Sequence, residues 1–196
     1  ILGKSPLPFH HNEYITFGSF SRFEKLSDDC LATFAEILKR VPDSRLYLKD
    51  QAYRRPYAIK RVMTALKDID KSRLMFATAT NHPEHLLVYQ SCDLYLDTYS
   101  HGAGVVTMEC LYQGIPLITR YGTQPAGRTA ASVLTAMGRT DWIAYSADEF
   151  VEKAVEWANR PADLAKARKV LRTELVESPV VKSYAGAVEQ AYRGLW

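Results

Sequence analysis

The sequence of 196 residues predicts an α/β fold with a doubly wound, mainly parallel sheet. Short apolar segments alternate along the chain with longer segments in which apolar residues recur at helical spacing. This alternation is typical of parallel strands joined by crossover helices. The length and the 47% hydrophobic content suit one domain with a buried core. We assign that domain to residues 14–196 and expect residues 1–13, with their prolines and paired histidines, to be an irregular lead-in.

Six apolar segments are predicted to form the strands. In chain order they are residues 14–19, 45–49, 74–77, 93–97, 115–119 and, as a short sixth strand, 142–144. Between and after them, helical periodicity predicts helices over residues 27–41, 56–66, 81–89, 105–112, 127–136, 146–157, 161–176 and 181–196. Strands of this length between such helices match the doubly wound pattern throughout the chain.

Helix boundaries are marked by residues with known terminal preferences. Ser27, Asn81 and Ser146 are suited to the N-cap position, because their side-chain oxygens can accept hydrogen bonds from first-turn N–H groups. Gly114 and Gly138 are suited to helix C-termini, where the backbone often turns left-handed. In a doubly wound sheet, ligands bind beyond the carboxyl ends of the strands near the point where the strand order reverses. The loops after the first, third, fourth and fifth strands are therefore the expected places for a ligand.

Composition excludes several classes of protein. Lys and Arg number 25 and Asp and Glu 22, spread along the chain, so the net charge of +3 provides no basic patch for nucleic acid. Apolar runs are too short to span a membrane. Cys30, Cys92 and Cys110 are odd in number and scattered, which predicts no metal site and a reducing, cytoplasmic location. The absence of an initial Met and of a signal pattern suggests a piece of a longer protein.

The segment of residues 96–119 has the most informative pattern. The predicted strand ends at Asp97, Gly102 and Gly104 permit a tight turn, and a helix starts directly afterwards. Free N–H groups and the dipole at such a helix start favour an anion. Glu109, about one turn further on, can accept hydrogen bonds from a ribose diol, so the segment suits a nucleotide. The alternative is a plain strand–helix turn with Glu109 in solvent.

This segment resembles the donor-site segment of GT-B glycosyltransferases, most closely that of the O-GlcNAc transferase/SPINDLY-type family. The residues that match the family pattern are Leu96, Asp97, Thr98, Glu109, Leu111, Gly114, Pro116 and Thr119. The resemblance extends over residues 19–25, 37–44, 84–85, 127–134 and 191–196. It therefore covers nearly the whole chain from Tyr14 onward, and implies the second, donor-binding lobe of a two-lobe enzyme.

The resemblance implies a role for each of several residues. Lys25 would contact the donor diphosphate and stabilise the leaving nucleotide, which makes it the catalytic candidate. The remaining candidates bind the donor. Arg22 would face the phosphates, Thr80 and His82 the base, His85 the nucleotide, Glu109 the ribose, His101 the sugar, and the helix start at Gly104, Val105, Val106 and Thr107 the phosphates. A surface lysine and a helix-covering histidine are the structural alternatives for Lys25 and His85.

The chain departs from the family at the helix start. The family usually has two threonines where this chain has Val105 and Val106, so two hydroxyl donors are missing while the N–H groups remain. Thr107 is expected to compensate in part. His101 at the tip of the turn also differs from the family. These departures leave the identity of the donor open.

The function that these patterns imply is donor binding in a UDP-sugar-dependent protein glycosyltransferase, with UDP-GlcNAc as the favoured donor and no metal or other cofactor. A hydroxyl acceptor, usually on a protein, and a separate N-terminal lobe would be its partners, and the chain alone is expected to transfer little or no sugar. The alternatives are a related lobe that uses UDP-glucose, GDP-fucose or another donor, and a degenerate lobe that serves protein interaction.

Overall fold

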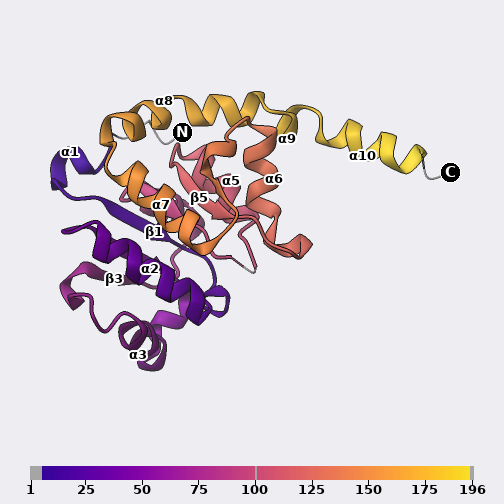
Figure 1. Cartoon of the computed structure of the whole chain (residues 1–196). Coiled ribbons are helices and arrows are strands. Elements are labelled where there is room, and N and C mark those ends of the chain that lie inside the picture. The colour runs from indigo at the N-terminus through magenta and orange to yellow at the C-terminus, as the bar shows by residue number, and fades with distance from the viewer. Residues whose placement is uncertain (1–5, 100, 195–196) are drawn as a thin grey trace.

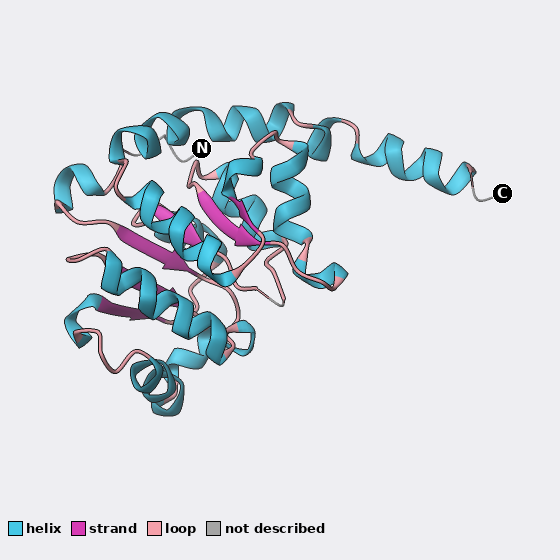
Figure 2. Cartoon of the chain, viewed as in Figure 1, coloured by secondary structure: helices cyan, strands magenta, loops and turns pink. Residues whose placement is uncertain are grey.

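The computed structural model describes residues 6–99 and 101–194. Six strands form one all-parallel sheet in the order β3-β2-β1-β4-β5-β6, with helices packed against it (Figures 1 and 2). The strands are β1 (Thr16–Ser19), β2 (Arg45–Lys49), β3 (Leu74–Ala77), β4 (Leu94–Leu96), β5 (Leu117–Arg120) and β6 (Ile143–Ala144). The α/β fold class is confirmed, and each strand lies within or beside its predicted segment.

The helices occupy the connections and the C-terminal part of the chain. They are α1 (Phe9–Asn12), α2 (Asp28–Arg40), α3 (Pro56–Ala65), α4 (His82–Tyr89), α5 (Val105–Tyr112), α6 (Thr129–Ala136), α7 (Ala147–Ala158), α8 (Pro161–Glu177), α9 (Pro179–Lys182) and α10 (Tyr184–Arg193). Helices α2 and α7 pack against each other over one face of the sheet (Figure 1). Short 3-10 turns add to these, among them η1 (Phe23–Lys25), which follows β1.

The strand order reverses between β1 and β4. The chain leaves β1 toward β2 and β3 on one side, then returns across the sheet to β4 and continues outward to β5 and β6. The registers pair Phe17 with Leu94 and Gly18 with Tyr95, so β1 and β4 lie side by side at the centre. Because the chain leaves these strands in opposite directions, the loops after them open away from each other at the carboxyl edge.

Most predicted helix boundaries are confirmed by their hydrogen bonds. The side chains of Ser27, Asn81 and Ser146 accept from the N–H groups of Cys30, Glu84 and Glu149. Gly114 and Gly138 have φ of 80° and 74°, the left-handed conformation expected after a helix.

Two segments differ from their predictions. The lead-in is not wholly irregular, because Phe9–Asn12 form one helical turn, α1. The predicted last helix is divided at Ser183, whose φ of −124° separates α9 from α10. Helix α10 has no buried residue and leads away from the rest of the chain (Figure 1). Apolar periodicity continues through both helices, so it did not indicate the break.

A buried carboxylate ties α1 to the centre of the sheet. The Asp93 side chain, just before β4, accepts hydrogen bonds from the N–H groups of Phe9 and Thr16, each at 2.8 Å. Burial raises the pKa of Asp93 to about 6, although these two hydrogen bonds act in the opposite direction. In the described part of the chain, no helix is long and apolar enough to cross a membrane.

We expect alanine substitutions at the two left-handed glycines to differ in effect. A Cβ at Gly114 would lie 2.7 Å from the carbonyl oxygen of Arg168, whereas a Cβ at Gly138 would meet nothing within 4 Å. Gly138→Ala should lower the free energy of unfolding by about 1 kcal/mol through backbone strain alone. Gly114→Ala adds a backbone clash and should lower it by roughly 3 kcal/mol. Urea unfolding measures both, and equal losses would contradict the packing described for Gly114.

Candidate functional site

The turn after β4 is organised by a buried carboxylate. Asp97 follows β4 directly and is fully buried. Its Oδ1 accepts a hydrogen bond from the Ala103 N–H at 3.1 Å, and its Oδ2 accepts one from the Thr119 hydroxyl at 2.8 Å. The carboxylate thus fixes the Gly102–Gly104 turn to strand β5. Burial raises the pKa of Asp97 to about 7, while these hydrogen bonds and the charge of Lys25 act to lower it.

Lys25 joins the two loops at the reversal point. It ends η1 in the loop after β1, and its ammonium donates to the Gly102 carbonyl oxygen at 2.9 Å. The Thr98 hydroxyl makes a second link, donating to the His101 carbonyl at 3.0 Å and lying 3.3 Å from Ser21 Oγ. An ammonium has three N–H donors, so Lys25 retains donors beyond the one that Gly102 engages. The structure therefore holds a cation at the turn that precedes α5.

The start of α5 has free backbone donors. Its N-cap is Gly104, which offers no side-chain cap, and the first-turn N–H groups of any α-helix lack intrahelical acceptors. Val105 is 73% exposed, so the helix start is reachable from solvent. The Thr107 side chain is not, because this residue is fully buried and its hydroxyl donates to the Ala103 carbonyl at 2.7 Å. The expected compensation by the Thr107 hydroxyl is thus not supported by this geometry.

A second polar cluster surrounds Glu109, one turn further along α5. The Tyr89 hydroxyl donates to Glu109 Oε2 at 3.0 Å, and His85 Nε2 lies 3.4 Å from the same oxygen. His82 Nδ1 lies 3.7 Å from Oε1. The side chain of Glu109 is 16% exposed, so it lies in the cluster rather than in open solvent. The alternative of a solvent-facing Glu109 is therefore wrong.

Lys49 lies behind the histidine. It ends β2, is 4% exposed, and places its ammonium 2.8 Å from His85 Nδ1 and 3.1 Å from the Thr80 hydroxyl. An ammonium can only donate, so Nδ1 accepts and the neutral imidazole carries its proton on Nε2, toward Glu109. Burial, and then the charge of Lys49, lower the pKa of His85. Burial also lowers the pKa of Lys49.

The two groups of residues lie along the same helix, α5, near the end of β1. Phe20 follows β1 and makes edge-on ring contacts with His85, Tyr89 and Tyr95. The Tyr95 hydroxyl in turn accepts from the Phe20 N–H at 2.8 Å. Helix α5 carries the free N–H groups at its start and Glu109 on the next turn. A cation and a helix start for phosphates, followed by a carboxylate for hydroxyls, match the order of groups in a nucleoside diphosphate.

Comparison with known proteins identifies the family of the chain. The sequence model of glycosyl transferase family 41 matches residues 7–188. The chain belongs to glycosyl transferase family 41. Arabidopsis thaliana SPINDLY, named a probable UDP-N-acetylglucosamine–peptide N-acetylglucosaminyltransferase, is 33% identical over 97% of this chain. The chain spans 21% of the length of that relative. A Caenorhabditis elegans UDP-N-acetylglucosamine–peptide N-acetylglucosaminyltransferase is 27% identical over 94% of the chain and 16% of its own length.

Solved structures share the fold. A Thermobaculum terrenum O-GlcNAc transferase mutant has a TM-score of 0.86 and 28% identity, over 93% of this chain and 36% of that one. The pneumococcal O-GlcNAc transferase GtfA, solved with UDP and GlcNAc, has a TM-score of 0.58 and 14% identity, over 90% and 35%. The second likeness shows the fold alone. The family-41 chain is thus a Rossmann-like lobe of the GT-B type.

Two predicted binding residues lie outside the contacts above. Arg22 is exposed and lines a cavity of about 550 Å³ with Asp50 and Arg55, beyond β2. His101 is exposed at the tip of the turn, where only its carbonyl is engaged by Thr98. Both lie on loops at the carboxyl edge of the sheet. The structure thus brings together Lys25 and the α5 start, and separately Thr80, His82, His85 and Glu109.

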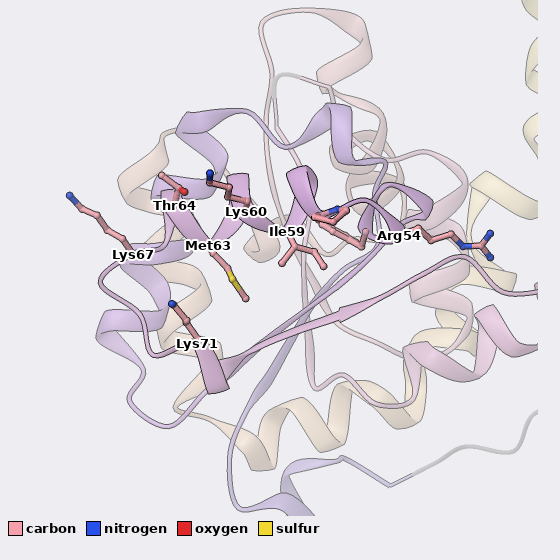
Figure 3. A pocket seen from close by; sticks show the side chains of 9 residues that line it. Arg54, Ile59, Lys60, Met63, Thr64, Lys67 and Lys71 are labelled. Atoms are coloured by element: carbon pink, nitrogen blue, oxygen red, sulfur yellow. The ribbon is translucent and has the colours of Figure 1, made fainter.

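A cavity of about 750 Å³ lies elsewhere in the fold. It lies along α3, with Ile59 and Met63 between Arg54 and Lys67 (Figure 3). None of the predicted site residues lines it. Within the described ranges, no group of three or more His, Cys, Asp or Glu side chains is arranged to hold a metal ion.

The sequence reasoning missed Lys49 and Tyr89. Lys49 ends the predicted strand 45–49 and Tyr89 ends the predicted helix 81–89, and neither is singled out by the sequence. A signal for Lys49 was present, since a charged residue that ends a strand of a parallel sheet lies at the ligand edge. Tyr89 gave no such signal, because its contact with Glu109 joins separate helices, α4 and α5.

We expect Asp97→Asn to flatten the pH dependence of stability. Between about pH 4, the ordinary aspartate value, and about pH 7, folded Asp97 keeps a proton that the unfolded chain has released. Raising the pH through this window should therefore lower the free energy of unfolding, by up to about 1.4 kcal/mol per pH unit. Urea unfolding at several pH values measures the slope. Asp148→Asn, which removes an exposed carboxyl, should retain it, and an unchanged slope in Asp97→Asn would contradict the assignment.

Proposed function

We propose that this chain is the donor-binding lobe of a UDP-sugar-dependent protein glycosyltransferase, with UDP-GlcNAc as donor. The observation that carries the proposal is the placement of Lys25 beside the open N-terminus of α5 at the reversal point of the sheet. This is where a doubly wound sheet binds nucleotides. The names of the SPINDLY and O-GlcNAc transferase relatives support the choice of donor.

In this proposal the diphosphate binds at the start of α5. The N–H groups of Val105 and Val106 would donate to its oxygens, and the helix dipole would favour its negative charge. The Lys25 ammonium would add a fixed cation beside the phosphate that becomes the leaving group. An acceptor hydroxyl would attack the anomeric carbon of the sugar, and the bond to UDP would break as charge builds on the diphosphate. Because Lys25 and the helix supply positive charge, the proposal needs no metal.

The ribose would lie further along α5. Glu109 Oε2 is engaged by Tyr89, so Oε1 is the better placed to accept ribose hydroxyls. Thr80 and His82, at the start of α4, would lie near the base. The acceptor and the rest of the catalytic groups would come from a separate N-terminal lobe. The three cysteines are buried and unpaired, which supports the cytoplasm as the location.

We expect Lys25→Ala to weaken UDP binding at least tenfold, because a charge-assisted contact to phosphate is lost. Calorimetric titration of the chain with UDP measures the affinity. Lys39→Ala is the matched control, since Lys39 is an exposed lysine on α2 whose ammonium lies 3.5 Å from Asp68.

The same titration separates the alternatives. Tighter binding of GDP than of UDP would indicate a different donor. No binding of either nucleotide at millimolar concentration would contradict the proposal and favour a lobe that serves protein interaction. The valines at the start of α5 and the internally bonded Thr107 hydroxyl are the features that would explain such a loss.

We expect the chain alone to transfer no measurable sugar from UDP-GlcNAc to peptide, because it spans about a fifth of its curated relatives. Transfer of radiolabelled GlcNAc to a serine-rich peptide measures this. Turnover by the chain alone that Lys25→Ala abolishes would contradict the requirement for a second lobe.

A further inference from the structure

The position of Lys49 in the fold does not by itself explain why its ammonium contacts His85. A lysine that is 4% exposed at the end of β2 is costly to bury as a cation. Its ammonium is compensated by the Thr80 hydroxyl and by His85 Nδ1. Its long-range partners are acidic, with Glu109, Glu84 and Asp50 each favouring its charged form. A buried cation is thus directed at the back of a histidine in the proposed donor site.

The consequence of this contact is a single tautomer of His85. With Nδ1 accepting from Lys49, the ring proton lies on Nε2, which faces Glu109 Oε2 at 3.4 Å. The lowered pKa of His85 is consistent with a neutral ring at this position. The Nε2–H group of His85 then faces Glu109 in a fixed direction. Without Lys49, only the nearby Glu109 carboxylate would favour a proton on Nε2, so the preference for this tautomer would weaken.

The Glu109 carboxylate is oriented from one side. Oε2 lies within reach of both the Tyr89 hydroxyl, at 3.0 Å, and His85 Nε2. His82 Nδ1 lies 3.7 Å from Oε1, and the His82 side chain is 68% exposed. With Tyr89 and His85 both placed against Oε2, Oε1 is the oxygen better placed to accept from a ligand. A carboxylate held in this way can select a ligand hydroxyl by direction as well as by charge.

We propose that Lys49 is a positioning residue for donor recognition: acting through His85, it orients Glu109 so that Oε1 accepts the ribose hydroxyls of the nucleotide. The inference rests on the proposed function for the identity of the ligand. The Lys49–His85–Glu109 chain itself rests on the geometry above. The charged and titratable groups that face it are Glu84, Asp50 and His82.

The first experiment needs no nucleotide. Nitrogen-15 NMR of histidine-labelled protein reports the tautomer and the titration of each ring, and His85→Gln identifies the His85 signals. We expect a neutral Nε2–H tautomer in the unmodified chain. Lys49→Met should mix the tautomers and raise the pKa of His85, because the adjacent cation is lost. Lys49→Arg, which keeps a cationic donor, should restore the tautomer, and Lys60→Met on the exposed face of α3 should change nothing. An unchanged His85 in Lys49→Met would overturn the proposal.

The second experiment tests the ribose role by calorimetry with UDP, 2′,3′-dideoxy-UDP and inorganic pyrophosphate. The unmodified chain should bind dideoxy-UDP at least tenfold more weakly than UDP, since a charge-assisted hydrogen bond is lost. In Lys49→Met this ratio should fall toward one, while the affinity for pyrophosphate stays within twofold. Equal losses for UDP, dideoxy-UDP and pyrophosphate would indicate a merely structural lysine and overturn the positioning role.

The two experiments separate failure of this inference from failure of the proposed function. If the unmodified chain binds no UDP, the proposed function and the ribose role both fall, whatever the state of His85. If UDP binds and Lys25→Ala weakens it, but Lys49→Met keeps the preference for UDP over dideoxy-UDP, only the inference about Lys49 falls.

Discussion

The candidate site depends on one constraint, which is the parallel pairing of β1 with β4 while the chain leaves them in opposite directions. This pairing places two loops at one edge of the sheet. Two interactions then fix the position of the second loop. Asp97 holds the Gly102–Gly104 turn against β5, and Lys25 crosses from the other loop to the Gly102 carbonyl. Helix α5 can start where it does because that turn is fixed.

The placement of charged groups at the candidate site is more informative than the net charge of the chain. The net charge of +3 is small for 196 residues. At the edge of the sheet, however, Lys25 and Lys49 are directed at different parts of the site, the first at the phosphate end and the second behind His85. The acidic Glu109 lies between hydroxyl and imidazole groups rather than against a lysine. This separation leaves a positive end and an acceptor end, which suits a ligand with phosphates at one end and hydroxyls at the other.

The valine pair at the start of α5 leaves fewer hydrogen-bond donors for a phosphate than a pair of threonines would. Threonine hydroxyls are absent at Val105 and Val106, and the Thr107 hydroxyl is engaged by Ala103. In the proposed function, recognition of a diphosphate therefore falls on backbone N–H groups and Lys25. Backbone donors do not change with the side chain, so valines in place of threonines remove side-chain donors and leave the N–H groups of the helix start. The proposed donor site would thus keep its backbone geometry with fewer side-chain donors.

Much of the fold could be predicted because its signals are local. The apolar pattern predicts the exact bounds of β2 and β3. The helix starts could be predicted because the side chains of Ser27, Asn81 and Ser146 bond to N–H groups three residues further along the chain. The candidate site could be predicted in part, since the Gly-containing turn and Glu109 lie in one segment.

The rest depends on contacts between distant elements. Nothing near Lys49 in the sequence indicates that β2 brings it to His85, 36 residues later. The division of the C-terminal segment at Ser183 was missed for a different reason, because the apolar pattern runs on through it.

The central claim is that a nucleoside diphosphate binds at the loops after β1 and β4 and along α5. Backbone amide NMR of the chain during titration with UDP tests this most directly, because it locates the ligand residue by residue. We expect the largest shift changes at Lys25, at Gly104–Val106 and around Glu109, with little change at Arg54 and Lys67 in the cavity beside α3. Changes confined to that cavity, or none at the start of α5, would contradict the account.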